Sequence, residues 1–160
     1  MSQENVEIVR GFFDAAERSL RAWAARRDRS LVDAIKKGDL PPETRAVLDY
    51  LSPEMEWNPV FSTETYRGQL DIARGWEDLL EATADYHLAL HEAFDIDGDR
   101  VFVSFGPSLE GRSSGIKVDA AVFGIVTIRN GLITDLDEYS DRREALEAAS
   151  LSEQDADADS

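Results

Sequence analysis

The chain of 160 residues contains no cysteine. This absence excludes disulfide bonds, thiolate zinc sites, iron–sulfur clusters and cysteine nucleophiles. A domain of this length buries roughly 68–70% of the surface that its unfolded chain exposes, so it needs no covalent or metal staple. We therefore expect one domain that is stabilised by an apolar core.

Long apolar runs are also missing, and basic residues are few. No segment approaches the ~20 apolar residues of a membrane span. A secretory signal is not expected, because the first twenty residues contain Glu4, Glu7, Asp14 and Glu17. The 17 basic residues face 33 acidic ones, which gives a net charge of −16. Such a chain repels nucleic acid and anionic membranes, and we predict a cytoplasmic protein that binds neither.

Histidine is rare too, and its placement argues against a metal site. The chain has two histidines, His87 and His91, four residues apart. On a helix they would be neighbours that could share a zinc ion, but on a strand they lie ~13 Å apart. The surrounding residues alternate with a period of two, which indicates a strand. With no glycine-rich phosphate loop before a helix either, we expect no metal and no cofactor.

Helix-forming periodicity dominates the first half of the chain. Spacings of three and four predict a long opening helix with an apolar face that consists of Val6, Val9, Phe13, Ala16, Leu20 and Trp23. A short helix is expected over residues 30–37, because Ser30 can cap its start and Gly38 suits a left-handed stop.

Prolines mark the next boundaries. Pro41 and Pro42 favour the first turn of a third helix, which Ser52-Pro53 ends. Residues 56–61 are typical of a short strand, and Pro59 within it predicts an edge or a bend. A fourth helix follows, with apolar residues on one side over 72–83.

The second half alternates with a period of two. We predict long strands over residues 86–96, 100–111, 116–129 and 132–140. Asp97-Gly98 and Asn130-Gly131 are strong signals for tight hairpins, and Ser113 to Gly115 makes a looser turn. Asp141 can cap a closing helix that runs to Ala149.

These elements predict an α+β domain over residues 2–150. Helices from the first half cover a curved antiparallel sheet made by the second half, and a curled sheet closed in this way leaves a cone-shaped cavity. Residues 151–160 are predicted to form a disordered acidic tail.

Several short motifs then carry a family resemblance. They are Ser2 to Arg10, Met55-Glu56-Trp57, Tyr66-Arg67-Gly68, Gly98 to Val101, Gly115 to Asp119, Thr127 to Gly131, Glu138 to Asp141 and Glu144-Ala145-Leu146. Their order and spacing resemble those of the SnoaL-like proteins in the nuclear transport factor 2-like superfamily. The resemblance implies a cone-shaped domain, commonly homodimeric, with an internal pocket. Members include cyclases, isomerases and dehydratases without metal or cofactor, whereas others only bind ligands or proteins.

The sequence departs from the family pattern twice. Residues 24–45 look like an insertion, which could form a lid over the pocket or an extra dimer contact. Many relatives also carry a histidine in the long strand after the valine-aspartate pair, and the nearest equivalent here is Gly124. This departure argues against a histidine-based mechanism.

Three carboxylates are candidates for acid–base chemistry. Glu92 and Glu138 each interrupt an apolar strand face, and lost hydration there raises the pKa of a carboxyl group toward the range useful for proton transfer. The alternative is a position near the sheet rim, solvated or paired with an arginine. Asp119 projects into the cavity mouth or accepts a turn hydrogen bond near Gly115.

Four further residues are candidates for ligand binding: Trp57, Asn58, Tyr66 and Tyr139. Aromatic rings offer broad apolar contact with a polar tip, and the Asn58 amide could orient a ligand carbonyl. Ordinary core packing is the alternative for each aromatic residue.

The hypothesis from sequence is a SnoaL-like pocket protein for a small apolar molecule, which as an enzyme would be a cofactor-free isomerase, cyclase or dehydratase. The alternative is a non-catalytic homodimer that binds a ligand or a protein. A polar cluster in the cavity would favour the enzyme, whereas an entirely apolar or filled cavity would favour the binding module.

Overall fold

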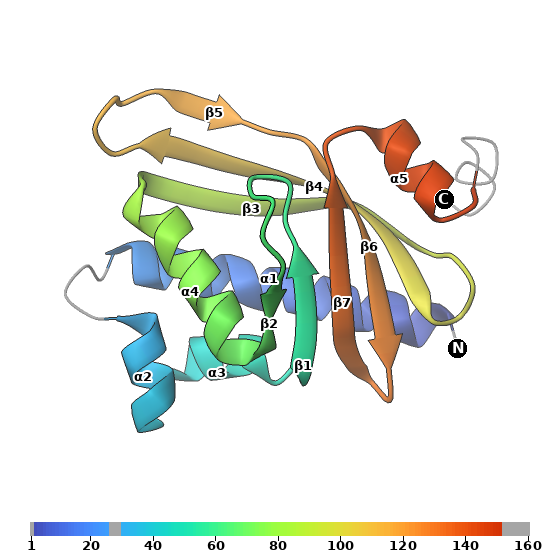
Figure 1. The fold of residues 1–160 in the computed structure, drawn as a ribbon, viewed down its shortest axis with the longest axis horizontal. Coiled ribbons are helices and arrows are strands. Elements are labelled where there is room, and N and C mark those ends of the chain that lie inside the picture. The colour runs from blue at the N-terminus through green and yellow to red at the C-terminus, as the bar shows by residue number, and fades with distance from the viewer. Residues whose placement is uncertain (1, 26–29, 152–160) are drawn as a thin grey trace.

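A computed structural model describes residues 2–25 and 30–151 (Figure 1). The elements in chain order are α1 (Ser2–Ala25), α2 (Leu31–Lys37), α3 (Pro42–Leu48), β1 (Leu51–Asn58), β2 (Tyr66–Arg67), α4 (Gly68–Glu81), β3 (Thr83–Asp95), β4 (Arg100–Gly111), β5 (Lys117–Asp119), β6 (Val122–Arg129), β7 (Leu132–Tyr139) and α5 (Arg142–Ala148). The predicted acidic tail lies outside the described residues, apart from Leu151. None of the described helices combines the length and the apolar character needed to cross a membrane.

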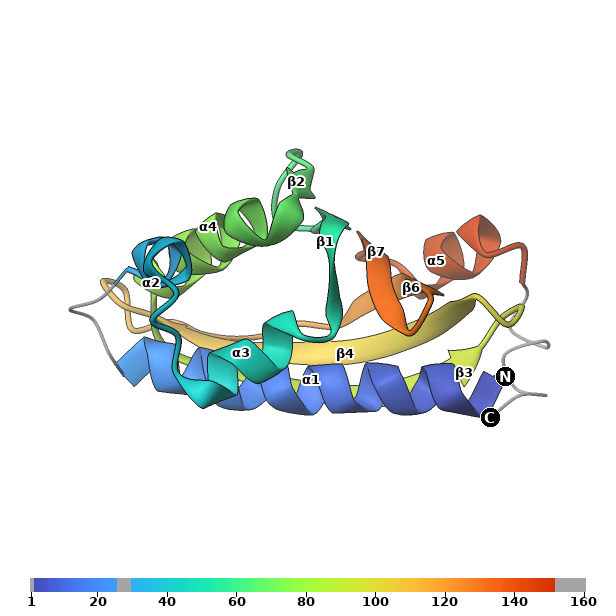
Figure 2. The same ribbon diagram turned by 90° about the horizontal axis from the view of Figure 1, so that it is seen from below.

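One strongly curved sheet organises the fold, with strand order β2-β1-β7-β6-β4-β3 and β5 paired to β4. Figure 2 shows that the sheet curls around an interior that α1 and α4 close from opposite sides. A small cluster on the other face joins α5 to the sheet through Phe94, Phe102, Ala145 and Leu146. The predicted α+β class, with a curved sheet covered by N-terminal helices, is confirmed.

The predicted hairpins form as their turn residues require. Asn130 and Gly131 have φ values of 54° and 78°, so both enter the left-handed region, as a tight two-residue hairpin needs. At the first hairpin only Gly98 does so, with a φ of 90°, and the turn is longer than predicted, because the Ile96 N–H donates to the Arg100 carbonyl across Asp97, Gly98 and Asp99. The strand predicted over 116–129 is divided in two. Ala120 and Ala121 separate β5, which pairs with the end of β4, from β6, which pairs with the beginning of β4.

Strand β1 differs from its prediction. It starts at Leu51, ends before Pro59, and lies between β2 and β7 rather than at an edge or a bend. Its pairing with β7 is parallel, the one parallel pairing among the described strands. Pro53 is tolerated because the β1–β7 register shifts between Leu51 and Glu56, which frees its position from the ladder. The sheet is therefore not built from the second half alone.

Residues 30–45 pack beside the helices and not across the cavity. The hydroxyl of Ser30 caps α2 and donates to Glu77 of α4 at 2.8 Å, and the Val32 N–H donates to the same carboxylate. No described residue between 30 and 45 lines the cavity. The described part of the 24–45 segment therefore does not support the predicted lid, and residues 26–29 of that segment lie outside the described residues.

A buried polar triad fixes α3 to α1. The indole N–H of Trp23 donates to the Thr44 hydroxyl at 2.6 Å, and the Ser19 hydroxyl lies 3.1 Å from the same oxygen. Ser19 and Thr44 are each 1% exposed. A buried donor without an acceptor destabilises the folded state, so this triad makes the position of α3 specific.

We expect Thr44→Val to lower the free energy of unfolding by about 1–3 kcal/mol, because it leaves the Trp23 N–H without its acceptor. Thr44→Ser is the matched control, since it keeps the hydroxyl and removes only the methyl group. Chemical denaturation of both variants measures the difference. Equal losses would show that packing, and not the hydrogen bond, holds α3.

Candidate functional site

An apolar cavity of about 190 Å³ lies between the sheet and the helices. Helix α1 contributes Phe12, Phe13, Ala16 and Leu20, which continue the stripe that buries this helix. The other wall residues are Leu51, Met55, Trp57, Val60, Phe61, Ile72, Trp76, Leu79, Tyr86, Leu88, Phe105, Pro107, Leu109, Ala120, Val122, Leu136 and Glu138. Among the described residues, Glu138 is the one charged side chain in this wall.

The carboxylate of Glu138 is held by two N–H donors. The indole N–H of Trp57 donates to Oε2 at 2.7 Å, and the backbone N–H of Val60 donates to Oε1 at 3.2 Å. Glu138 is near the end of β7, opposite Gly124 of β6, and its neighbours on the same face are apolar. Each oxygen keeps a lone pair that a bound molecule could use.

Burial raises the pKa of Glu138 from 4.5 to about 7, and the bonds from Trp57 and Val60 lower it only in part. Glu138 is half-buried, so part of the residue is still accessible to solvent. A carboxyl group with a pKa near neutral exchanges protons readily at physiological pH, which is the property that acid–base catalysis requires.

Tyr86 adds a hydroxyl to the same wall from β3. Burial raises its pKa, followed by the negative charges of Glu138 and Glu17. The phenol therefore stays protonated near neutral pH and is available as a hydrogen-bond donor. Tyr86 is not among the candidates identified from the sequence. Its signal was a hydroxyl in an otherwise apolar row.

Glu92 lies outside the cavity. A β-bulge in β3 makes Leu90 pair with Phe105 and Glu92 with Ser104, so the chain advances two residues on one strand and one on the other. The extra residue turns later side chains to the opposite face. Glu92 instead forms an ion pair with Arg142 of α5, with N–O distances of 2.6 and 3.4 Å. Its predicted position on the inward face is wrong, and the arginine-paired alternative is observed.

Asp119 is exposed on β5 and accepts a hydrogen bond from the Ser108 hydroxyl across the β4–β5 pairing. It borders a polar depression on the surface together with Asp85, His87 and Lys117. Asp119 is absent from the cavity wall, so neither its carboxylate nor its turn contributes to that site.

Of the four predicted binding residues, Trp57 lies in the cavity wall and the other three lie outside it. Trp57 lines the cavity and also packs against its neighbours, as both interpretations had it. Asn58 points to the other face of β1, where it donates to Asp137 at 2.6 Å. Tyr66 is buried beneath Arg74, with the guanidinium 5.0 Å from the ring centre, and Tyr139 packs in the cluster under α5. Neither tyrosine reaches the cavity.

Gly124 explains the missing histidine of the family pattern. A Cβ atom built there would lie 3.1 Å from side-chain atoms of both Leu136 and Val103, and 3.3 Å from the Asp137 carbonyl oxygen. The space next to Glu138 on this strand is thus already filled. A histidine would require the surrounding wall to move.

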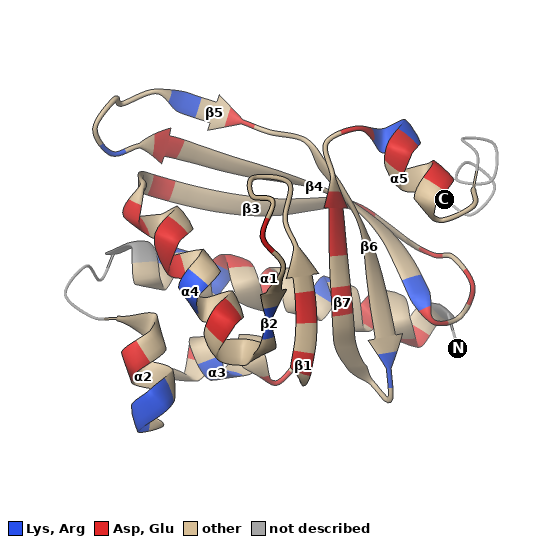
Figure 3. Ribbon diagram, in the orientation of Figure 1, with Lys and Arg blue, Asp and Glu red and all other residues tan. Residues whose placement is uncertain are grey.

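The described residues contain no group of three or more His, Asp or Glu side chains that could hold a metal ion. His87 contacts Glu17 and Asp85, at 3.5 and 3.0 Å. Acidic residues occur on most helices and strands, with basic residues interspersed (Figure 3).

A curved, unclosed sheet with helices around an apolar interior defines a nuclear transport factor 2-like fold. The sequence matches the model of the SnoaL-like domain over residues 29–136, more than half of the chain. The chain therefore belongs to the SnoaL-like domain family. No protein of curated function matches it.

Solved structures with this fold are similar to the chain at low identity. An NTF2-like protein from Burkholderia xenovorans LB400 is 22% identical, with 93% of this chain and 97% of that chain covered and a TM-score of 0.56. A candidate SnoaL-like polyketide cyclase from Jannaschia sp. CCS1 is 17% identical, covers 94% of both chains and has a TM-score of 0.58. TerC, co-crystallized with polyporic acid, is 18% identical, covers 82% and 99%, and has a TM-score of 0.53.

The raised pKa of Glu138 makes a prediction about stability. Because the folded-state pKa of about 7 exceeds the unfolded value of 4.5, the folded state binds the proton more tightly, and stability falls as the pH rises from about 4.5 to 7. The full effect is about 3 kcal/mol. Relative to wild type, Glu138→Gln should therefore gain about 2–3 kcal/mol in unfolding free energy between pH 5 and pH 8.

Urea unfolding of both proteins at several pH values measures this difference. The net charge of −16 affects both proteins almost equally and cancels. If the unfolding free energies of wild type and Glu138→Gln differed by the same amount at every pH, Glu138 would titrate like an exposed carboxylate.

Proposed function

We propose that the protein binds a small, largely apolar molecule in the cavity and catalyses a cofactor-free acid–base reaction on it, an isomerisation, cyclisation or dehydration. One observation carries the proposal. A carboxylate with a pKa of about 7 stands alone in an apolar wall, oriented by the Trp57 and Val60 N–H groups. We assign Glu138 the role of the group that takes a proton from the substrate and returns it.

Tyr86 is the second catalytic candidate. Proton abstraction next to a carbonyl group places negative charge on the carbonyl oxygen, and a hydrogen-bond donor in an apolar site stabilises that charge. The Trp57 N–H already donates to Glu138, whereas the Tyr86 hydroxyl has no hydrogen-bond acceptor among the described residues. The phenol is therefore proposed to bind the substrate oxygen.

The wall also limits the class of ligand. Its described residues include no lysine or arginine, so a phosphate or carboxylate would enter without a counter-charge and would meet Glu138. A neutral molecule with one polar oxygen and an apolar skeleton fits this inventory. Trp76, Phe13 and Phe105 would contact the skeleton. TerC, which shares this fold, was co-crystallized with polyporic acid, a small organic molecule.

A non-catalytic homodimeric module that binds a ligand or a protein is the second candidate. It is favoured by one observation, namely that each Glu138 oxygen already accepts a hydrogen bond. In that case Glu138 would orient a polar ligand group and transfer no proton. Sedimentation of the purified chain tests the dimer separately.

Binding is tested first, by thermal shift with neutral cyclic ketones, aromatic polyketide-like compounds, epoxides and steroids. A ligand at a hundredfold excess over its dissociation constant adds about 2.7 kcal/mol, which corresponds to roughly 5–10 °C for a chain of this size. No shift from the whole panel would contradict the ligand cavity.

Catalysis is tested by the incorporation of solvent deuterium next to the carbonyl group of each ketone that binds, followed by NMR. We expect Glu138→Gln to lower the exchange rate by about 10²–10⁴ and Tyr86→Phe by about 10²–10³, with binding retained. Glu92→Gln is the matched control, because it makes the same chemical change on the opposite face of the sheet. Binding without exchange in the wild type would favour the non-catalytic module.

A further inference from the structure

The turn at Val60 and Phe61 stands at the mouth of the cavity, between β1 and β2. Both side chains line the cavity, although they are 40% and 48% exposed. The Phe61 ring meets the Trp57 ring edge-on, with 5.6 Å between the centroids. Val60 and Phe61 are therefore positioned to cover the mouth of the cavity.

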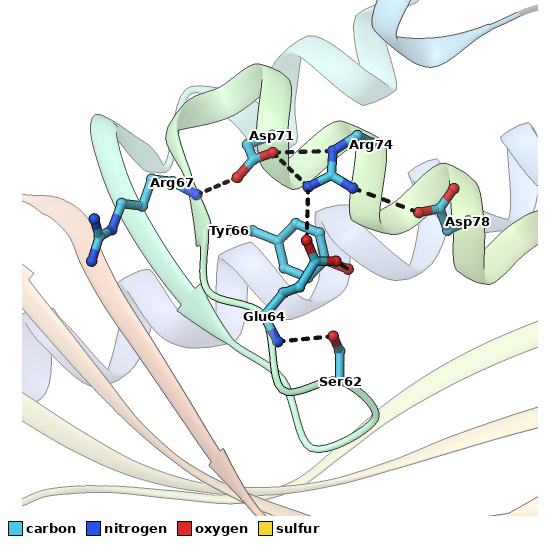
Figure 4. A network of polar contacts seen from close by, with 7 residues as sticks. All are labelled: Ser62, Glu64, Tyr66, Arg67, Asp71, Arg74 and Asp78. Carbon is cyan, nitrogen blue, oxygen red and sulfur yellow. Dashed lines mark hydrogen bonds and ion pairs between the residues drawn. The ribbon is translucent and has the colours of Figure 1, made fainter.

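The two sides of this turn are held very differently. On the side that leads into β2, the Tyr66 hydroxyl donates to Glu64 at 3.2 Å and Arg74 of α4 approaches the same carboxylate at 3.7 Å (Figure 4). The Glu64 N–H also donates to the Ser62 hydroxyl at 3.0 Å. This side is therefore anchored to α4.

On the side that follows β1, the Val60 N–H donates to Glu138 Oε1. Among the described residues, this is the hydrogen bond between the turn and the cavity wall. The Phe61–Trp57 ring contact also joins the turn to the wall, and the Thr65 hydroxyl donates to Asn58 at 2.6 Å across the base of the turn. Of these contacts, the bond to Glu138 is the one whose strength changes with the charge of a carboxylate. An ionised carboxylate accepts a charge-assisted hydrogen bond, which is roughly twice as strong as a neutral one.

We propose that the Val60–Phe61 turn is a cap over the cavity, closed while Glu138 is ionised and loosened when Glu138 takes a proton. Its use in capturing a ligand rests on the proposed function, whereas the linkage of the cap to Glu138 does not. The ionised form, which is the one able to abstract a proton, is then also the form that keeps the mouth shut.

The groups that face Glu138 are uncharged near neutral pH, so the protonation of Glu138 itself determines the strength of its bond to the Val60 N–H. From β1 it faces the Trp57 N–H, from β3 the Tyr86 phenol, and from β6 Gly124. The adjacent Asp137 points to the other face and bonds Asn58. No other charged side chain of the described residues lines the cavity, and burial places the pKa of Glu138 near neutral.

The first test measures solvent exchange of the Val60 amide by NMR on the full ¹⁵N-labelled chain, corrected for the intrinsic dependence on pH. We expect the protection of this amide to rise about five- to tenfold from pH 6 to pH 8 in the wild type. In Glu138→Gln, whose side chain does not ionise, protection should not change with pH. A flat wild-type profile, or the same rise in the variant, would overturn the proposal.

The second test follows entry of a neutral fluorescent probe, N-phenyl-1-naphthylamine, by stopped flow. Entry into the wild type should be about fivefold slower at pH 8 than at pH 6. Phe61→Ala should be fast at both pH values. Leu70→Ala is the matched control, because Leu70 is 43% exposed on α4 but does not line the cavity, and it should behave like the wild type.

The two tests separate the two proposals. If the Val60 amide responds to pH but neither the wild type nor Phe61→Ala takes up the probe, the cap stands and the ligand cavity is contradicted. If the probe enters the wild type and Phe61→Ala at equal rates that do not change with pH, the cavity stands and the cap is overturned.

Discussion

The parallel pairing of β1 with β7 is the constraint on which the site depends. Its register places Trp57 beside Leu136, two residues before Glu138, so that the indole N–H reaches the carboxylate at 2.7 Å. The same pairing brings the turn after β1 close enough for the Val60 N–H to bond the other oxygen. A shift of one residue would turn Trp57 to the opposite face and leave a buried carboxylate without either donor.

Local chemistry predicted most elements of the fold. The apolar stripe of α1, the turns at Gly98 and Asn130-Gly131 and the cap at Asp141 depend on neighbours in sequence, and each forms as expected. The parallel β1–β7 pairing joins segments about 80 residues apart and leaves no local pattern, so β1 was assigned to an edge or a bend. The position of β1 between β2 and β7 could not be inferred from Pro59 alone.

The candidate site could be predicted only where strand alternation was unbroken. Glu138 was identified because the end of β7, beyond the register shift between Ile133 and Asp135, keeps the period of two. Trp57 was chosen because an aromatic ring offers broad apolar contact. Glu92 was misplaced because a bulge adds a residue to β3, and no turn residue in the sequence announces it. Tyr86 belonged to the same inward row but, as an aromatic residue in an apolar face, it was indistinguishable from ordinary core.

The residues proposed to react and the residues that shape the space for a ligand come from different elements of the fold. The two groups proposed to react, Glu138 and Tyr86, are on strands of the sheet, whereas much of the shape of the cavity comes from side chains of α1 and α4. Substitutions such as Leu20 to a smaller residue or Leu79 to a larger one would reshape the room for a ligand while both reactive groups keep their places. Substitutions in the helices could therefore fit the cavity to molecules of other shapes, while the two groups proposed to react stay where they are.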